Sequence, residues 1–217
     1  MKKSFLALVL TMSATVLFSQ DIGLSKPPAK LGLDVLDAVR ARVAARAFVK
    51  RDVPVADLST IVWAGNGLKA TTDAVSAASK AGGTYPVSGD VNYVNLFVMT
   101  AKGVYRYLPE INLLKQVSTK DARGSVTSEN IATSAFMVLF TYDSTRLPVF
   151  VKGNPAAGRE MAMGTASYGA ENIGLVAAGL KLASIVMYNL NPAAVVEAAK
   201  LPKEEMPLFI MQLGYTQ

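Results

Sequence analysis

The chain has 217 residues, of which 51% are hydrophobic and 18% charged, so it can form one globular domain with its own core. It contains no histidine and no cysteine, which excludes a Ser-His-Asp triad, a thiolate nucleophile, disulfides and cysteine-based metal sites. An enzyme of this composition would depend on a bound cofactor, or on carboxylates, lysine or tyrosine.

The first twenty residues (1–20) are typical of a secretory signal peptide. Lys2 and Lys3 give a positive start, an apolar core follows, and Ser19 and Gln20 precede the expected cleavage site. The core is shorter than the roughly 20 residues that span a bilayer; the alternative is an uncleaved anchor or a buried helix. We therefore expect export to a bacterial periplasm or to the exterior. Loss of the two lysines lowers the net charge from +6 to +4, which suits a small anionic ligand or an acidic surface.

Residues 21–33 are expected to form a linker, and residues 34–217 a single domain. The domain begins with a predicted helix over Asp34–Phe48, in which apolar residues recur at helical spacing. Arg42 and Arg46 are four residues apart and would share one face of this helix. Such a pair can clamp an anion such as phosphate, and the alternative is a solvated basic face.

Two more helices are expected. Pro54 can open the first, the run Gly65–Gly67 ends it, and Trp63, the only tryptophan, is expected in the core rather than as a ligand platform. The second helix covers Glu160–Leu180. It carries alanine and glycine on several sides, which indicates close packing against another helix or against a second subunit, or ordinary core packing.

A loop rich in small residues leads into a predicted β-hairpin over Gly82–Tyr107, which turns at Ala101–Gly103. The loop contains the run Pro86–Gly89. Because it has little side-chain bulk, its backbone N–H groups can approach a flat or anionic ligand closely. The alternative is a plain surface loop and hairpin.

Three further strands are predicted. The continuous apolar run Ala135–Phe140 is typical of a central strand buried on both faces, and Ala183–Met187 and Met206–Leu213 follow it. Between the last two strands lies a turn, in which Asn191 is placed to cap a short helix from Pro192. With the hairpin, the sequence predicts an α+β domain with five strands.

Four motifs, taken in order, resemble the FMN-dependent nitroreductase family, closest to its thiazoline-oxidase-like dehydrogenase branch. The resemblance covers about residues 34–214. Arg42–Phe48 is similar to the family's Arg-x-Ser-x-Arg/Lys-x-Phe signature. The other motifs are the helix end Trp63–Gly67, the loop Pro86–Gly89 with the hairpin strand Gly103–Tyr107, and the closing segments Glu171–Leu180 and Pro207–Gly214.

The resemblance implies a nitroreductase-like fold, with a central, mainly antiparallel sheet flanked by helices, and a homodimer with FMN at the subunit interface. It implies an oxidoreductase that transfers hydride or electrons through the flavin to a small-molecule substrate. Two arginines would meet the FMN phosphate, the small-residue loop would line the isoalloxazine, and the turn after the fourth strand would face flavin N5. The implied cofactor-binding residues are Arg42, Ala44, Arg46, Pro86, Val87, Ser88, Gly89, Tyr188 and Asn189.

Two positions depart from the family pattern. Ala44 stands where the signature has Ser, and Val87 where the loop has the Ser of Pro-Ser; each lost contact can weaken binding by on the order of 1 kcal/mol. Three hypotheses therefore stay open: an exported FMN oxidoreductase with an unknown electron donor, a degenerate protein of this fold that serves as a binding or structural module with weak or no flavin, and a mildly basic protein that binds an anionic surface. No run of basic residues interleaved with aromatics points to nucleic acid, and no acidic cluster points to a metal.

Overall fold

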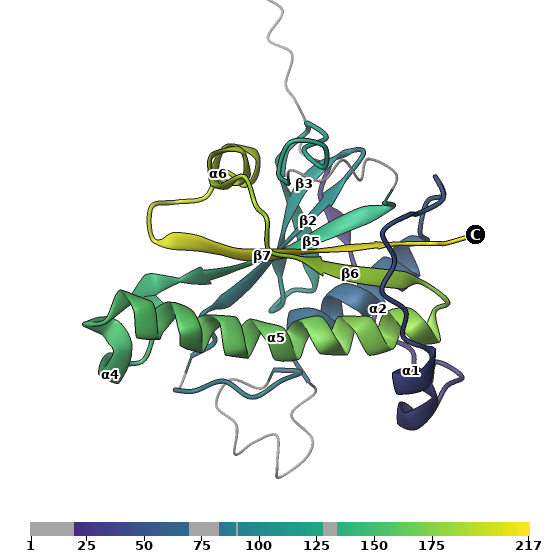
Figure 1. Cartoon of the computed structure of the whole chain (residues 1–217), viewed down its shortest axis with the longest axis horizontal. Coiled ribbons are helices and arrows are strands. Elements are labelled where there is room, and N and C mark those ends of the chain that lie inside the picture. The colour runs from purple at the N-terminus through teal and green to yellow at the C-terminus, as the bar shows by residue number, and fades with distance from the viewer. Residues whose placement is uncertain (1–19, 70–82, 90, 128–133) are drawn as a thin grey trace, which may run out of the picture.

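The structure, a computed structural model, describes residues 20–69, 83–89, 91–127 and 134–217 (Figure 1). Apart from Gln20, the expected signal peptide lies outside the described residues. Seven strands form one sheet in the order β1-β4-β3-β2-β5-β7-β6, and each neighbouring pair is antiparallel. The predicted α+β class and the antiparallel sheet are confirmed, but the predicted number of five strands is wrong.

Five of the strands are those that the sequence predicts. They are β2 (Val94–Thr100), β3 (Gly103–Leu108), β5 (Phe136–Asp143), β6 (Ala183–Met187) and β7 (Glu205–Gly214). The β5 strand lies between β2 and β7, and its side chains are buried along nearly its whole length. This position between two other strands explains why the apolar run is continuous rather than alternating.

The two strands that the sequence does not predict lie together at one edge of the sheet. β4 (Leu113–Ser118) pairs with β3, and β1 (Ile22–Gly23) pairs with β4. β1 falls in the range expected to be a linker, and two residues are too few to give a periodic signal. β4 mixes lysine and glutamine with its apolar residues, as an edge strand with one solvated face does.

Helices cover both faces of the sheet (Figure 1). α5 (Pro155–Gly179) and α2 (Val55–Asn66) pack together on one face, and α6 (Pro192–Ala199) lies on the other. The short helices are α1 (Val35–Ala41), η1 (Ser144–Arg146) and α4 (Val149–Lys152). The predicted cap of α6 is confirmed, because the Asn191 side chain accepts a hydrogen bond of 3.3 Å from the Ala194 N–H.

The small residues of α5 allow it to lie close to α2. A Cβ added at Gly169 would come within 2.4 Å of the Gly65 carbonyl oxygen, so no other residue fits between the two helices without moving one of them. The predicted close packing of this helix is therefore confirmed within one chain.

The first predicted helix is much shorter than the expected range Asp34–Phe48. α1 ends at Ala41, and Arg42 has extended backbone angles of φ −61° and ψ 123°. The chain then lies against the edge of β6, where the Val43 carbonyl accepts a hydrogen bond of 3.2 Å from the Ser184 N–H. Pairing with the sheet edge therefore replaces the second half of the expected helix.

Candidate functional site

A cavity of about 310 Å³ lies between α5 and the edge of the sheet formed by β6 and β7. Three parts of the chain that are far apart in sequence meet in it. Arg42 and Ala44 come from the extended segment after α1, Glu171 and Gly174 come from α5, and Tyr188 follows β6. The cavity thus contains residues from the first and the last of the sequence motifs.

Arg42 enters this cavity because α5 has a glycine beneath it. A Cβ added at Gly174 would come within 3.1 Å of Arg42 Cδ, so the missing side chain provides the space that the arginine crosses. The Nε atom of Arg42 lies 3.6 Å from Glu171 Oε1, and both side chains are partly exposed. The cavity therefore pairs a guanidinium with a carboxylate one turn of helix away from Gly174.

An aromatic wall closes another side of the cavity. Tyr188 is 66% exposed, and its ring meets the buried Phe209 ring edge-on, with the two centroids 5.7 Å apart. Most of the Tyr188 ring is therefore accessible to a ligand, and the Phe209 ring packs against it. Ser167 of α5 and Ser184 of β6 add hydroxyl groups to the lining.

Ala44 lines the cavity, but Arg46 does not. Ala44 forms a bridge with Ser184 at the edge of β6, and Arg46 is exposed two residues further on. Because α1 ends before both arginines, Arg42 and Arg46 do not share a helix face, and the predicted helical pair is wrong. The chain brings one of the two arginines to this cavity.

The loop Pro86–Gly89 follows a tyrosine that lies against α5. Its neighbour Tyr85 packs against Gly169 and donates a hydrogen bond of 2.7 Å to Asn66 Oδ1, and burial raises the pKa of the Tyr85 hydroxyl well above its ordinary value. Gly89 has a positive φ of +99° and lies next to Pro148. None of the four residues Pro86, Val87, Ser88 and Gly89 lines the cavity.

Asn189 also lies outside the cavity lining, although its neighbour Tyr188 is part of it. Its Oδ1 accepts a hydrogen bond of 3.3 Å from the Thr127 hydroxyl, which ties the turn after β6 to the loop after β4. One chain therefore brings together Arg42, Ala44 and Tyr188 of the nine predicted site residues.

Sequence reasoning missed the acidic partner of Arg42. Ser167, Glu171 and Gly174 stand at positions i, i+4 and i+7 of α5 and so share one helix face, and that spacing is the signal that could have found them. Among the described residues, no group of three or more acidic side chains could hold a metal ion. In the same residues, no helix is both long and apolar enough to cross a membrane.

The sequence profile of the nitroreductase family matches residues 39–215, which include every cavity residue named above. The chain belongs to the nitroreductase family. A search of the curated proteins finds no match.

Solved structures of low sequence identity share the fold of this nitroreductase-family chain. A protein from Ralstonia eutropha JMP134, named as a nitroreductase, has a TM-score of 0.79 at 22% identity over 91% of this chain and 90% of its own. The NADPH:FMN oxidoreductase of Vibrio harveyi has a TM-score of 0.58 at 17% identity over 84% and 69%.

A third similar structure is the Escherichia coli microcin synthetase complex McbBCD, with a TM-score of 0.65 at 16% identity over 99% of this chain and 85% of that one. It is compatible with the thiazoline-oxidase-like branch that the sequence motifs resemble. At these identities the three structures show the fold of the family and not a shared substrate.

Proposed function

We propose that this nitroreductase-family chain is an exported FMN-dependent oxidoreductase that works as a homodimer on a small-molecule substrate. The observation that carries the proposal is that Arg42 and the exposed ring of Tyr188 line one cavity of about 310 Å³. A cation for a phosphate and an aromatic surface for a flat ring are the two features that FMN requires of a site. The family match supports flavin-dependent oxidoreductase chemistry.

The cavity residues of one chain fit part of an FMN-binding site. Arg42, seated over Gly174, would bind the phosphate, and Tyr188 would cover one face of the ring system. The hydroxyl of Ser184 would donate a hydrogen bond to a polar part of the cofactor, while the hydroxyl of Ser167, which already donates to the Met163 carbonyl, would accept one. Bound FMN supplies the acceptance and delivery of hydride or electrons, which this chain cannot supply with histidine or cysteine.

The rest of the site would come from a second copy of the chain. The loop Pro86–Gly89, which lines no part of the cavity, would reach it from the other subunit. Exposed apolar residues support such an association: Val35 and Leu36 of α1 are 71% and 64% exposed, and Phe150 of α4 is 74% exposed. Arg46 would then meet the cofactor only in the assembled dimer.

A second candidate function is a binding protein of the same fold that has lost flavin. Two observations favour it. Ala44 supplies a methyl group where the family signature has a hydroxyl, and Glu171 places a negative charge beside the one arginine of the cavity. The missing hydroxyl at position 44 and the nearby negative charge of Glu171 both weaken a site for a dianionic phosphate.

The colour of the purified protein separates the two candidates. The full-length chain, made in a flavin-sufficient host, should be yellow, should bleach on reduction, and should release FMN that mass analysis identifies. Arg42→Gln should lower FMN content, while the control Arg40→Gln, which changes an exposed arginine paired with Asp37, should not. A colourless protein that also ignores added FMN would exclude the oxidoreductase.

Export is tested by fractionating cells that make the full-length chain. We expect a shortened protein that starts near Asp21 in the periplasm or the medium. Full-length protein that stays in the cytoplasm would contradict the proposed signal peptide, without bearing on flavin binding.

A further inference from the structure

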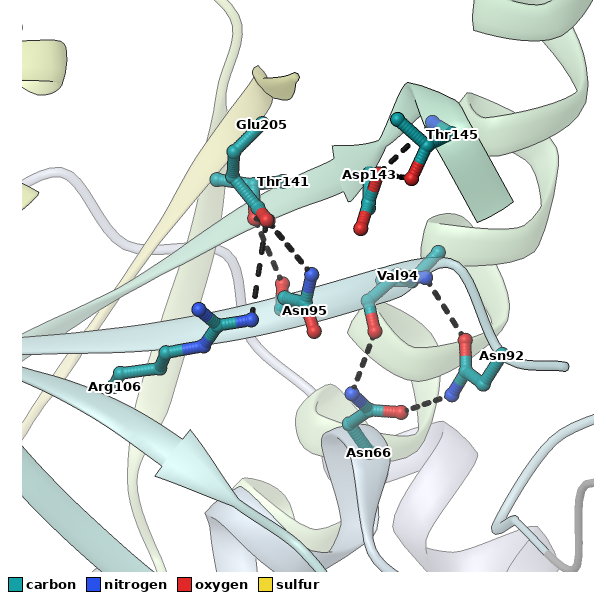
Figure 2. A network of polar contacts seen from close by, with 9 residues as sticks. All are labelled: Asn66, Asn92, Val94, Asn95, Arg106, Thr141, Asp143, Thr145 and Glu205. Atoms are coloured by element: carbon teal, nitrogen blue, oxygen red, sulfur yellow. Dashed lines mark hydrogen bonds and ion pairs between the residues drawn. The ribbon is translucent and has the colours of Figure 1, made fainter. Parts of the chain in front are cut away.

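A second cavity of about 310 Å³ lies at the end of the sheet where β2 begins and β3 ends. Figure 2 shows the polar lining residues Asn66, Asn92, Asn95 and Arg106, and Arg146 of η1, which the figure does not draw, lines the cavity too. It shares no lining residue with the cavity around Arg42. We propose that this cavity binds a small organic carboxylate, a role separate from the flavin chemistry.

Arg106 can bind a ligand because the buried carboxylate beside it, that of Glu205, already accepts hydrogen bonds from other residues. Glu205 accepts hydrogen bonds of 2.8 and 3.0 Å from Asn95 Nδ2 and a further one from the Thr141 hydroxyl (Figure 2). Arg106 Nη2 is 3.9 Å away from Glu205, a loose ion contact. A guanidinium has five N–H donors, and the Arg106 side chain is 36% exposed, so donors are left for a ligand.

Arg146 brings a second guanidinium to the same cavity from a different element. Within the described part of the chain it makes no hydrogen bond or ion pair, and it is exposed. Glu110, an exposed residue at the mouth of the cavity, balances one of the two charges. The residues that line the cavity therefore carry one net positive charge, with the buried Glu205 carboxylate behind them.

The amide groups of the cavity are held in fixed orientations. Asn66 Nδ2 donates to the Val94 carbonyl at 2.9 Å, and its Oδ1 accepts from the Tyr85 hydroxyl and from Asn92. The Nδ2 of Asn95 is engaged with Glu205, which leaves its Oδ1 as an acceptor. A site with its polar groups already fixed loses little entropy when a ligand binds.

These groups favour a carboxylate over a phosphate. A guanidinium can bind either anion through two parallel N–H groups, so the charge of the ligand decides between them. A dianionic phosphate would face the oxygens of Asn95 and Glu110 in addition to the two arginines, with the Glu205 charge behind them.

Equilibrium dialysis of the full-length protein against labelled acetate and labelled propionate tests the proposal. We expect saturable binding of one molecule per chain. Arg146→Gln should weaken the affinity about tenfold, the loss of one charge-assisted contact. The control Arg40→Gln, on α1, should leave the affinity unchanged, and Arg106→Gln should weaken it as well, with circular dichroism to confirm folding.

Three outcomes would overturn the proposal: no saturable binding of either carboxylate, an unchanged affinity in folded Arg146→Gln protein, or competition by inorganic phosphate as strong as competition by unlabelled acetate. The dialysis contains no flavin. A negative result here is therefore distinct from a negative result in the flavin test.

Discussion

Arg42 Nε lies 3.6 Å from Glu171 Oε1 in the cavity between α5 and β6. The Arg42 side chain is 41% exposed and that of Glu171 is 61% exposed, so water screens the pair and it contributes little to stability. An anion that binds to Arg42 must nevertheless either displace the Glu171 side chain or be repelled by its nearby negative charge. This carboxylate therefore sets how well the site can hold a phosphate.

Glu171→Gln should tighten the binding of FMN, because it removes a negative charge from the phosphate end of the cavity. The gain should be about 1 kcal/mol, or roughly fivefold in Kd. Riboflavin, which has no phosphate, should bind as it does to the unchanged protein. Quenching of flavin fluorescence measures both affinities.

The control for this prediction is Glu160→Gln, which removes an exposed carboxylate of α5 outside the cavity lining. It should change neither affinity. An equal change for FMN and riboflavin in Glu171→Gln protein would mean that Glu171 does not act on the phosphate.

Tyr188→Ser should weaken FMN and riboflavin equally, because the exposed ring would contact the part that the two flavins share. The expected loss is about 1 kcal/mol, the typical worth of an aromatic contact. Since Tyr188 is 66% exposed, the free energy of unfolding should stay unchanged, which chemical denaturation can verify. A loss confined to FMN would place the tyrosine at the phosphate instead.

Gly169→Ala should destabilise the fold by about 1–3 kcal/mol, because the new methyl group would collide with the Gly65 carbonyl oxygen 2.4 Å away. Gly164→Ala on the same helix is the matched control. No atom lies within 4 Å of its added Cβ, so it should stabilise the helix by roughly 0.5–1 kcal/mol. Urea denaturation of the two variants should give shifts of opposite sign.

Asp121→Asn should lower stability at neutral pH and have less effect in acid. Arg123 donates two hydrogen bonds to the Asp121 carboxylate, of 2.9 and 2.7 Å, and so holds its pKa below the ordinary value of 3.8. This contribution to stability is fully present above the unfolded-state pKa and is lost as the pH falls through the lower folded-state pKa.

The Asp121 side chain is 41% exposed, so the difference at neutral pH should be about 1 kcal/mol or less. Denaturation of both proteins at pH 7 and near pH 3 measures it. A difference that grows on acidification would contradict the ion pair as its cause.

The sequence predicts the central elements well, because their patterns have one local explanation. The continuous apolar run of β5 is typical of a strand buried on both faces, and Asn191 followed by Pro192 is a local signal for the start of a helix. The end of α1 could not be predicted in the same way. The alanine-rich sequence after Arg42 favours a helix, and the hydrogen bond between Val43 and Ser184 that overrides it joins distant parts of the chain.

The sequence motifs predicted only part of the candidate site. The cavity contains Arg42, Ala44 and Tyr188, but the motif Pro86–Gly89 lies outside it. Glu171 begins the last motif, but its contact with Arg42 depends on α5 passing beside the segment that follows α1, which the motif does not show. For the same reason the cavity around Arg106 has no signature in the sequence, since its residues come from α2, β2, β3 and η1.

The two-residue strand β1 covers part of the outer edge of β4, at one side of the sheet. The Gln20 N–H donates to Gln116 Oε1, and the Gln116 N–H donates to Asp21, so the first described residues are fastened along β4. A truncated chain that began at residue 34 would strip this cover and leave the main-chain groups of β4 facing water. Strands from other copies of the chain could then pair with the uncovered edge of β4. We therefore expect the truncated protein to aggregate more than the longer chain.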